Sequence, residues 1–120
     1  MSNLKIHIMT QKEKFIRDRQ ADFPEIEKMQ DWIDKGYVWS MEGSIGRAAH
    51  NGLECGMYFL PNQSFVNPYG TRIPSREEIR IGTEGSLDNA YDFYNDDENL
   101  WELEANSFIL EYNAYEDDQW

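Results

Sequence analysis

Apolar residues follow two spacings along the chain, one typical of helices and one typical of strands. Helical spacing is found over residues 22–35, 44–54 and 87–95. Ser44 and Ser86 stand at the start of the second and third of these segments, where a serine hydroxyl is suited to cap a helix. The pattern therefore predicts three helices.

Shorter apolar runs predict strands. They lie at residues 4–9, 37–41 and 57–60, and residues 101–115 alternate polar and apolar side chains like one bent strand or a hairpin. Residues 11–20 are mostly polar and fit either a helix or an exposed loop.

The predicted order of elements is strand, helix, strand, helix, strand, loop, helix and strand. This order indicates one compact α+β domain over residues 1–120, with a mostly antiparallel sheet and two or three helices on one face. Residues 61–86 hold three of the four prolines and form a long, turn-rich connection. Such a connection is either a binding loop or only a link, and the sequence leaves both open.

Charge divides this domain into two parts. Residues 1–80 contain all 11 Lys and Arg residues and an equal number of acids, so this part is balanced. Residues 81–120 contain no Lys or Arg, and they carry the whole net charge of −12. An acidic end of this kind attracts cationic partners and repels nucleic acid and anionic membranes. We therefore expect neither direct binding of nucleic acid nor binding to a membrane.

Asp88, Asp92 and Asp96 are spaced by four residues, which would align them on one face of the helix predicted over 87–95. At a rise of 1.5 Å per residue they repeat about every 6 Å, which is close to the spacing of phosphates along a DNA strand. One interpretation is a partial mimic of DNA, and the other is an ordinary solvated helix face. The complete lack of Lys and Arg after residue 80 favours a partner, because ordinary surfaces mix both signs.

The partner expected from this charge is a basic, nucleic-acid-binding protein whose surface the acids would occupy and inhibit. Aromatic side chains would anchor the contact. The predicted partner-binding residues are Asp88, Asp92, Asp96, Asp97, Glu98, Glu102, Glu104, Tyr91, Tyr94 and Trp101. An immunity protein or antitoxin for a basic nuclease would use the same mechanism. A homodimer that joins the basic segment 11–20 of one copy to the acidic end of another is a further alternative.

Glycine-containing turns near arginines indicate a different class of function. The predicted helix that begins at Ser44 presents backbone N–H groups of the kind that bind anions. A nucleotide-like phosphorylated small molecule could be sequestered there by Ser44, Arg47, Arg72 and Arg76. The competing interpretation is that the glycines only satisfy turn geometry and the arginines pair with acids. The lack of a P-loop or dinucleotide-binding motif favours this competing interpretation.

The sequence shows no enzyme motif. His50 and Cys55 are five residues apart, so on one helix they point in different directions. One cysteine and two separated histidines give no zinc spacing, and residues 95–99 lack the glycine of a calcium loop. We therefore predict no catalytic residue, no cofactor and no metal. The single Cys55, with no signal peptide and no apolar run of about 18 residues, predicts a cytoplasmic protein.

Several short motifs resemble those of a family of small, functionally uncharacterised proteins of tailed bacteriophages. The resemblance covers roughly residues 30–90, so most of the acidic end lies outside it. It rests on Trp39, Glu42-Gly43-Ser44-x-Gly46-Arg47-Ala48, Pro74-Ser75-Arg76 and Gly82-Thr83-x-Gly85-Ser86. It implies a phage protein that acts in a bacterial cytoplasm, where such proteins often antagonise host enzymes or defence systems.

Overall fold

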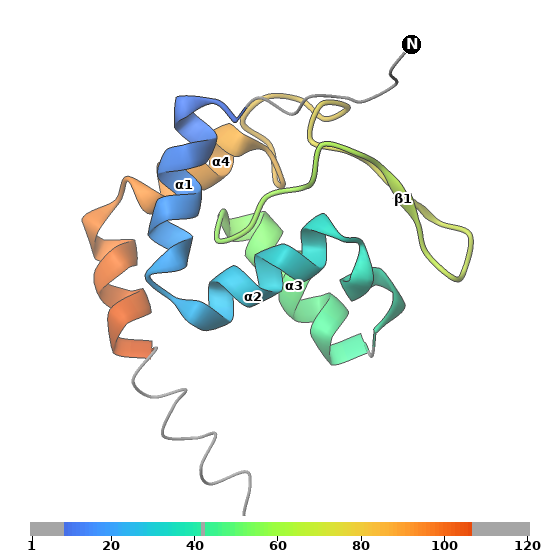
Figure 1. The fold of residues 1–120 in the computed structure, drawn as a ribbon, viewed down its shortest axis with the longest axis horizontal. Coiled ribbons are helices and arrows are strands. Elements are labelled where there is room, and N and C mark those ends of the chain that lie inside the picture. The colour runs from blue at the N-terminus through green and yellow to red at the C-terminus, as the bar shows by residue number, and fades with distance from the viewer. Residues whose placement is uncertain (1–8, 42, 107–120) are drawn as a thin grey trace, which may run out of the picture.

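The described part of the chain, residues 9–41 and 43–106 of a computed structural model, consists mainly of helices (Figure 1). In chain order the elements are α1 (Gln11–Ala21), α2 (Pro24–Asp34), the 3-10 helix η1 (Tyr37–Ser40), α3 (Gly43–Cys55), β1 (Phe65–Val66), β2 (Arg72–Ile73) and α4 (Leu87–Tyr94). Residues 97–106 are also helical. No helix within these described residues has both the length and the apolar character needed to cross a membrane.

The predicted α+β fold with a mostly antiparallel sheet is wrong. Within the described residues the sheet consists of β1 and β2 alone, an antiparallel pair in which Phe65 faces Ile73 and Val66 faces Arg72. Figure 1 shows this hairpin projecting to one side of the helices. The remaining described elements pack helix against helix, and none of the buried core residues found in the described part of the chain belongs to β1 or β2.

Two of the predicted strands are helical. Residues 37–41 form η1 and the bend after it, and residues 101–105 lie in the helical stretch 97–106. Short apolar runs fit both structures, so their periodicity alone does not separate a strand from a helix. Leu103 is buried and Trp101 is exposed, as the two faces of a helix require. The strand predicted over 4–9 and the rest of that over 101–115 lie almost entirely outside the described residues.

The three predicted helices are confirmed as α2, α3 and α4. The hydroxyl of Ser86 accepts a hydrogen bond from the Asn89 N–H at 3.1 Å and caps α4 as expected. Ser44 lies inside α3 rather than before it, because that helix already begins at Gly43. The segment 11–20, which the sequence left open, belongs to α1, whose cap is Thr10.

Residues 57–61, the central segment, replace the predicted strand over 57–60. Tyr58, Phe59 and Leu60 are all less than a tenth exposed, yet the segment pairs with no strand in the described part of the chain. Instead, the side-chain amide of Gln30 accepts from the Phe59 N–H at 3.1 Å and donates to the Phe59 carbonyl at 2.9 Å. The amide of Gln20 donates to the Met57 carbonyl at 3.1 Å. Side chains thus satisfy buried backbone groups that a sheet would otherwise satisfy.

The core lies where α1 packs against α2 and α4 and where α3 packs against α4 and η1. The central segment passes through this core, and Phe59 is fully buried. The hydrophobic core side chains with no more than 1% exposure are Ile16, Ile33, Val38, Ala49, Phe59, Ala90 and Tyr94. All of them belong to one continuous cluster.

Candidate functional site

Asp88, the first acid of the predicted stripe, is paired within the chain. Its carboxylate forms an ion pair with the Lys12 ammonium of α1, and the same ammonium lies 5.4 Å from the centre of the Tyr91 ring. The hydrogen bond to Asp88 raises the pKa of Lys12 above its usual range. The basic segment therefore meets the acidic region inside one molecule, because α1 packs directly on α4.

The predicted row of Asp88, Asp92 and Asp96 does not continue along one helix. Helix α4 ends at Tyr94, and Asp96 lies beyond it. One oxygen of Asp96 accepts from the Glu98 N–H at 2.9 Å, so this carboxylate helps to start the helical stretch 97–106. The repeat of about 6 Å expected for a continuous helix is thus limited to Asp88 and Asp92.

The three predicted aromatic anchors differ in exposure. Tyr94 is 0% exposed, and its hydroxyl donates to the Met57 carbonyl at 2.7 Å, so it is part of the core rather than of a binding surface. Burial raises the pKa of this hydroxyl above its usual range. Tyr91 is half-buried, with its ring centre 5.2 Å from that of Phe15. Trp101 is 66% exposed and is available to a partner.

Trp101 stands among carboxylates on the solvent side of the helical stretch 97–106. Leu103, and in part Leu100, face the core, so the opposite side is turned to solvent. Asp97 and Glu104 lie one turn before and one turn after Trp101 on the same side of the helix. Glu98 and Glu102, four residues apart, form the neighbouring row beside it. All four acids are exposed. We call this surface the Trp101 face and define it as Asp97, Glu98, Trp101, Glu102 and Glu104.

No carboxylate of the Trp101 face forms an ion pair with a Lys or Arg of the described residues. The basic side chains of those residues that form ion pairs do so elsewhere: Lys12 with Asp88, Lys14 with Asp18, Arg17 with Glu13 and Asp34, Lys35 with Asp31, Arg72 with Glu78, and Arg76 with Glu13. Within the described part of the chain, no ion pair neutralises the acids of this face.

The predicted site for a phosphorylated ligand is not assembled. Arg72 pairs with Glu78, whose pKa is lowered to about 2 by the Ser75 N–H and by Arg72. Arg76 binds Glu13 at 2.9 Å, and its side chain is only 9% exposed. Ser44 and Arg47 are exposed on α3, and no described hydrogen bond or ion pair joins them to either arginine. Two of the four candidate residues therefore serve internal ion pairs.

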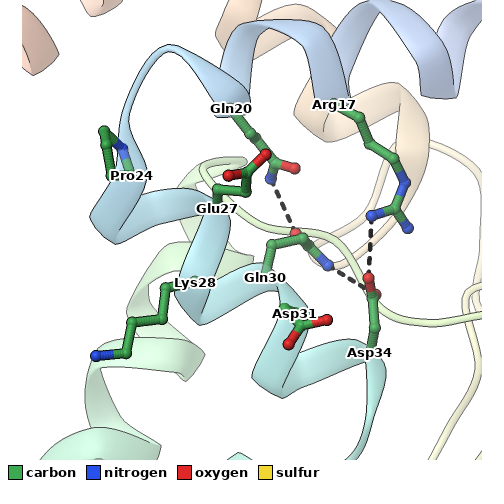
Figure 2. Close-up of a pocket in the computed structure, with 8 residues that line it drawn as sticks. All are labelled: Arg17, Gln20, Pro24, Glu27, Lys28, Gln30, Asp31 and Asp34. Atoms are coloured by element: carbon green, nitrogen blue, oxygen red, sulfur yellow. Dashed lines mark hydrogen bonds and ion pairs between the residues drawn. The ribbon is translucent and has the colours of Figure 1, made fainter.

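A polar cleft of about 470 Å³ opens between α1 and α2 (Figure 2). Its polar groups are largely engaged with one another. Arg17 binds Asp34 at 3.0 Å, and Gln30 binds Asp34 at 3.0 Å and Gln20 at 2.9 Å. The cleft is lined by Arg17, Gln20, Pro24, Glu27, Lys28, Gln30, Asp31 and Asp34. Gln20 and Gln30, which line this cleft, are the same side chains that bond to the backbone of the central segment.

One constellation was not predicted from the sequence. His50 and Glu54 of α3 and Glu84 of the turn before α4 are exposed, and their metal-ligating atoms all lie within 4.8 Å of one another. His50 and Glu54 are spaced by four on a predicted helix, which is a visible signal. The third member was hidden because Glu84 belongs to the long connection 61–86, whose path the sequence did not reveal.

Comparison of the chain with protein-family models, with curated proteins and with solved structures finds no match. The described residues form a mainly helical fold with an acidic face whose carboxylates have no Lys or Arg partner among those residues. The resemblance to a family of bacteriophage proteins stays a prediction.

Proposed function

We propose that this protein is a non-enzymatic inhibitor that occupies a basic, nucleic-acid-binding surface of another protein, acting in part as a mimic of DNA. The proposal is carried by one observation, the exposure of Trp101 among four carboxylates that have no basic partner within residues 9–41 and 43–106. In the setting that the bacteriophage resemblance implies, the target is a host protein in a bacterial cytoplasm, and the outcome is host takeover or anti-defence.

The chemistry of the Trp101 face suits such a target. Carboxylates accept paired hydrogen bonds from arginine and charge contacts from lysine, the side chains that proteins use to bind phosphates. A large exposed indole supplies the apolar anchor that charge alone lacks, because tryptophan and arginine dominate the binding energy of many interfaces. Asp92 and Asp96, which are also exposed, extend the negative surface toward α4.

The arrangement of the acids also argues against a purely solubilising role. Glu98 and Glu102 are separated by four residues on one helical stretch, and like charges at this spacing destabilise a helix by about 0.2–0.5 kcal/mol. A basic partner would relieve this repulsion on binding. An immunity protein or antitoxin for a basic nuclease would use the same surface, and the identity of the partner separates the two.

The test is capture of a partner and its displacement by DNA. The full chain is immobilised, incubated with bacterial lysate at low salt and eluted with a salt gradient. The purified partner is then titrated with the protein in the presence and absence of duplex DNA. We expect DNA to compete with the protein, and we expect affinity to fall steeply as salt rises from 0.05 to 0.2 M, values chosen because screening shortens to about 8 Å near 0.15 M.

Two variants of equal net charge identify the surface. The first neutralises the Trp101 face, with Asp97→Asn, Glu98→Gln, Glu102→Gln and Glu104→Gln. The second neutralises four exposed acids elsewhere, with Asp22→Asn, Glu25→Gln, Glu27→Gln and Glu77→Gln. Loss of binding in the first variant alone supports the proposal. Equal binding by both variants, or a partner that DNA does not displace, contradicts it.

A further inference from the structure

We propose that His50, Glu54 and Glu84 form a binding site for a divalent first-row transition-metal ion. The three side chains supply one imidazole nitrogen and two carboxylate groups, and their ligating atoms all lie within 4.8 Å of one another. The site uses none of the residues of the Trp101 face, so it goes beyond the proposed function and is tested separately from it.

Two of the ligands come from one face of α3. His50 and Glu54 are four residues apart in this helix, so they lie one above the other on the same side. This spacing brings an imidazole and a carboxylate to one point without any change of the backbone. Both side chains are exposed, which leaves them free to adjust around an ion.

The third ligand, Glu84, is brought to this point by the backbone hydrogen bonds of the next residue, Gly85. The N–H of Gly85 donates to the Leu53 carbonyl at 3.1 Å, and its carbonyl accepts from the Leu60 N–H at 2.8 Å. Gly85 has a φ of +86°, and a Cβ at this position would lie 2.7 Å from a methyl group of Leu60. The turn that carries Glu84 is therefore held against Leu53, the residue before Glu54.

A second set of contacts holds α4 to the same end of α3. The side-chain amide of Asn89 donates to the carbonyls of Leu53 at 3.2 Å and Glu54 at 3.3 Å. The turn that carries Glu84 is thus tied to α3 through Gly85, and the helix that follows this turn is tied to α3 through Asn89. A site whose ligand-bearing backbones are already in place loses little conformational entropy when an ion binds.

Charge supplies the driving force for a cation. Glu54 and Glu84 bring two negative groups together, and neither forms an ion pair with a Lys or Arg of the described residues. Metal–ligand bonds of about 2.1 Å require ligand atoms roughly 3–3.5 Å apart, so rotation of the exposed side chains suffices to close the site. A divalent ion would neutralise both carboxylates at once.

The ligand set selects the kind of ion. An imidazole nitrogen suits zinc, nickel and cobalt, whereas magnesium and calcium prefer oxygen ligands alone. Three protein ligands leave at least one position for water or for a group from another molecule. We therefore expect Zn²⁺ to bind more tightly than Mg²⁺ or Ca²⁺, and we use Zn²⁺ as the probe.

The experiment titrates ZnCl₂ into the full chain, produced without a histidine tag, and follows binding by calorimetry and thermal unfolding. We expect one Zn²⁺ per chain and a rise in Tm of more than about 3 °C, because an ion that joins α3 to the turn before α4 stabilises the folded state. His50→Ala and Glu84→Gln should each weaken Zn²⁺ binding at least about tenfold.

Matched controls locate the ion at this cluster. His7→Ala removes the other histidine of the chain, Cys55→Ser removes the one thiol, and Glu77→Gln removes an exposed glutamate elsewhere. All three should bind Zn²⁺ as the parent chain does. The visible absorption of bound Co²⁺ gives a second measure of binding that does not depend on stability. Unchanged binding in His50→Ala or Glu84→Gln overturns the proposal, and so does binding of Mg²⁺ or Ca²⁺ as tight as that of Zn²⁺.

Discussion

The side-chain amide of Gln30 pairs with the backbone of Phe59 as a neighbouring strand would, accepting from its N–H at 3.1 Å and donating to its carbonyl at 2.9 Å. Gln30 is 1% exposed and Phe59 is fully buried, so water does not replace these bonds. The amide is held in turn by Asp34 and Gln20. One glutamine of α2 thereby allows an irregular, apolar segment to cross a helical core.

We expect Gln30→Ala to destabilise the protein by about 2–4 kcal/mol, because it leaves a buried N–H and a buried carbonyl without partners. Urea unfolding followed by far-UV circular dichroism measures the loss. Gln11→Ala, which changes an exposed glutamine in α1, should stay within about 0.5 kcal/mol. If both variants unfold at the same urea concentration, the amide does not hold the central segment.

The sequence predicts the elements whose signals are local. The α2, α3 and α4 helices have helical apolar spacing, and α4 also has the serine cap that the sequence indicates. The central segment has equally clear apolar character, but the backbone groups of Met57 and Phe59 bond to side chains of Gln20 and Gln30, which lie on other elements. Nothing in the spacing of residues 57–60 reveals such partners, so a strand was the natural but wrong prediction.

The same limit applies to the candidate site. The concentration of acids after residue 80 is visible in the sequence. The helical stretch 97–106 that carries the Trp101 face is not, because the alternation over residues 101–115 predicted a strand or a hairpin there. Which acids are free is not visible, because the partner of Asp88 is Lys12, 76 residues away. The burial of Tyr94 agrees with the helical spacing of residues 87–95, which puts it on the apolar side of α4 with Ala90. Its additional assignment as a partner anchor was therefore wrong.

Glu13 is a buried carboxylate that holds two arginines. It is 1% exposed, and it binds Arg17 at 2.9 Å and Arg76 at 2.9 Å. Arg76 also donates to the Leu60 carbonyl at 3.2 Å, so the charge pair extends to the central segment. Removing the carboxylate would take one counter-ion from the largely buried guanidinium of Arg76, whereas Arg17 would keep Asp34.

We expect Glu13→Ala to cost about 3–5 kcal/mol, the usual cost of breaking one side of a buried ion pair. Chemical unfolding at neutral pH measures it. Asp18→Ala breaks the exposed pair with Lys14 on the same helix and should cost at most about 0.5 kcal/mol. A loss below about 1 kcal/mol for Glu13→Ala would show that this ion pair is dispensable for folding.

Two glycines of α3 should respond in opposite directions to alanine. A Cβ at Gly52 would lie 2.0 Å from the ring of Tyr58, whereas a Cβ at Gly46 meets nothing closer than the Val38 carbonyl oxygen at 3.9 Å. Gly46→Ala should stabilise the protein by about 0.5–1 kcal/mol through helix propensity. Gly52→Ala should destabilise it by about 1–3 kcal/mol through overpacking. Thermal unfolding of both variants measures these two changes in stability. A gain in stability for Gly52→Ala would mean that the Tyr58 ring moves freely.

Burial raises the pKa of Tyr58 to about 12, from an ordinary value of 10.0. A raised pKa means that the folded state keeps a proton that the unfolded state loses. The associated stability is complete below about pH 10 and is lost as pH rises toward about 12. The loss amounts to roughly 2–3 kcal/mol. Urea unfolding at pH 8 and at pH 11.5, both chosen to bracket this window, should show it. In Tyr58→Phe the loss should be smaller, and an equal loss would assign it to other groups.

Glu102→Lys should separate stability from binding at the Trp101 face. Glu98 and Glu102 repel each other at a spacing of four, and a lysine at 102 would turn this repulsion into an attraction in the favoured order, with glutamate first. We expect a gain of about 0.5–1 kcal/mol in urea unfolding, about half of which should appear in Glu102→Gln. Binding of the captured partner should weaken at the same time. A variant that is less stable than the parent chain would mean that Glu102 serves the fold, and the acidic face would then need no partner to explain it.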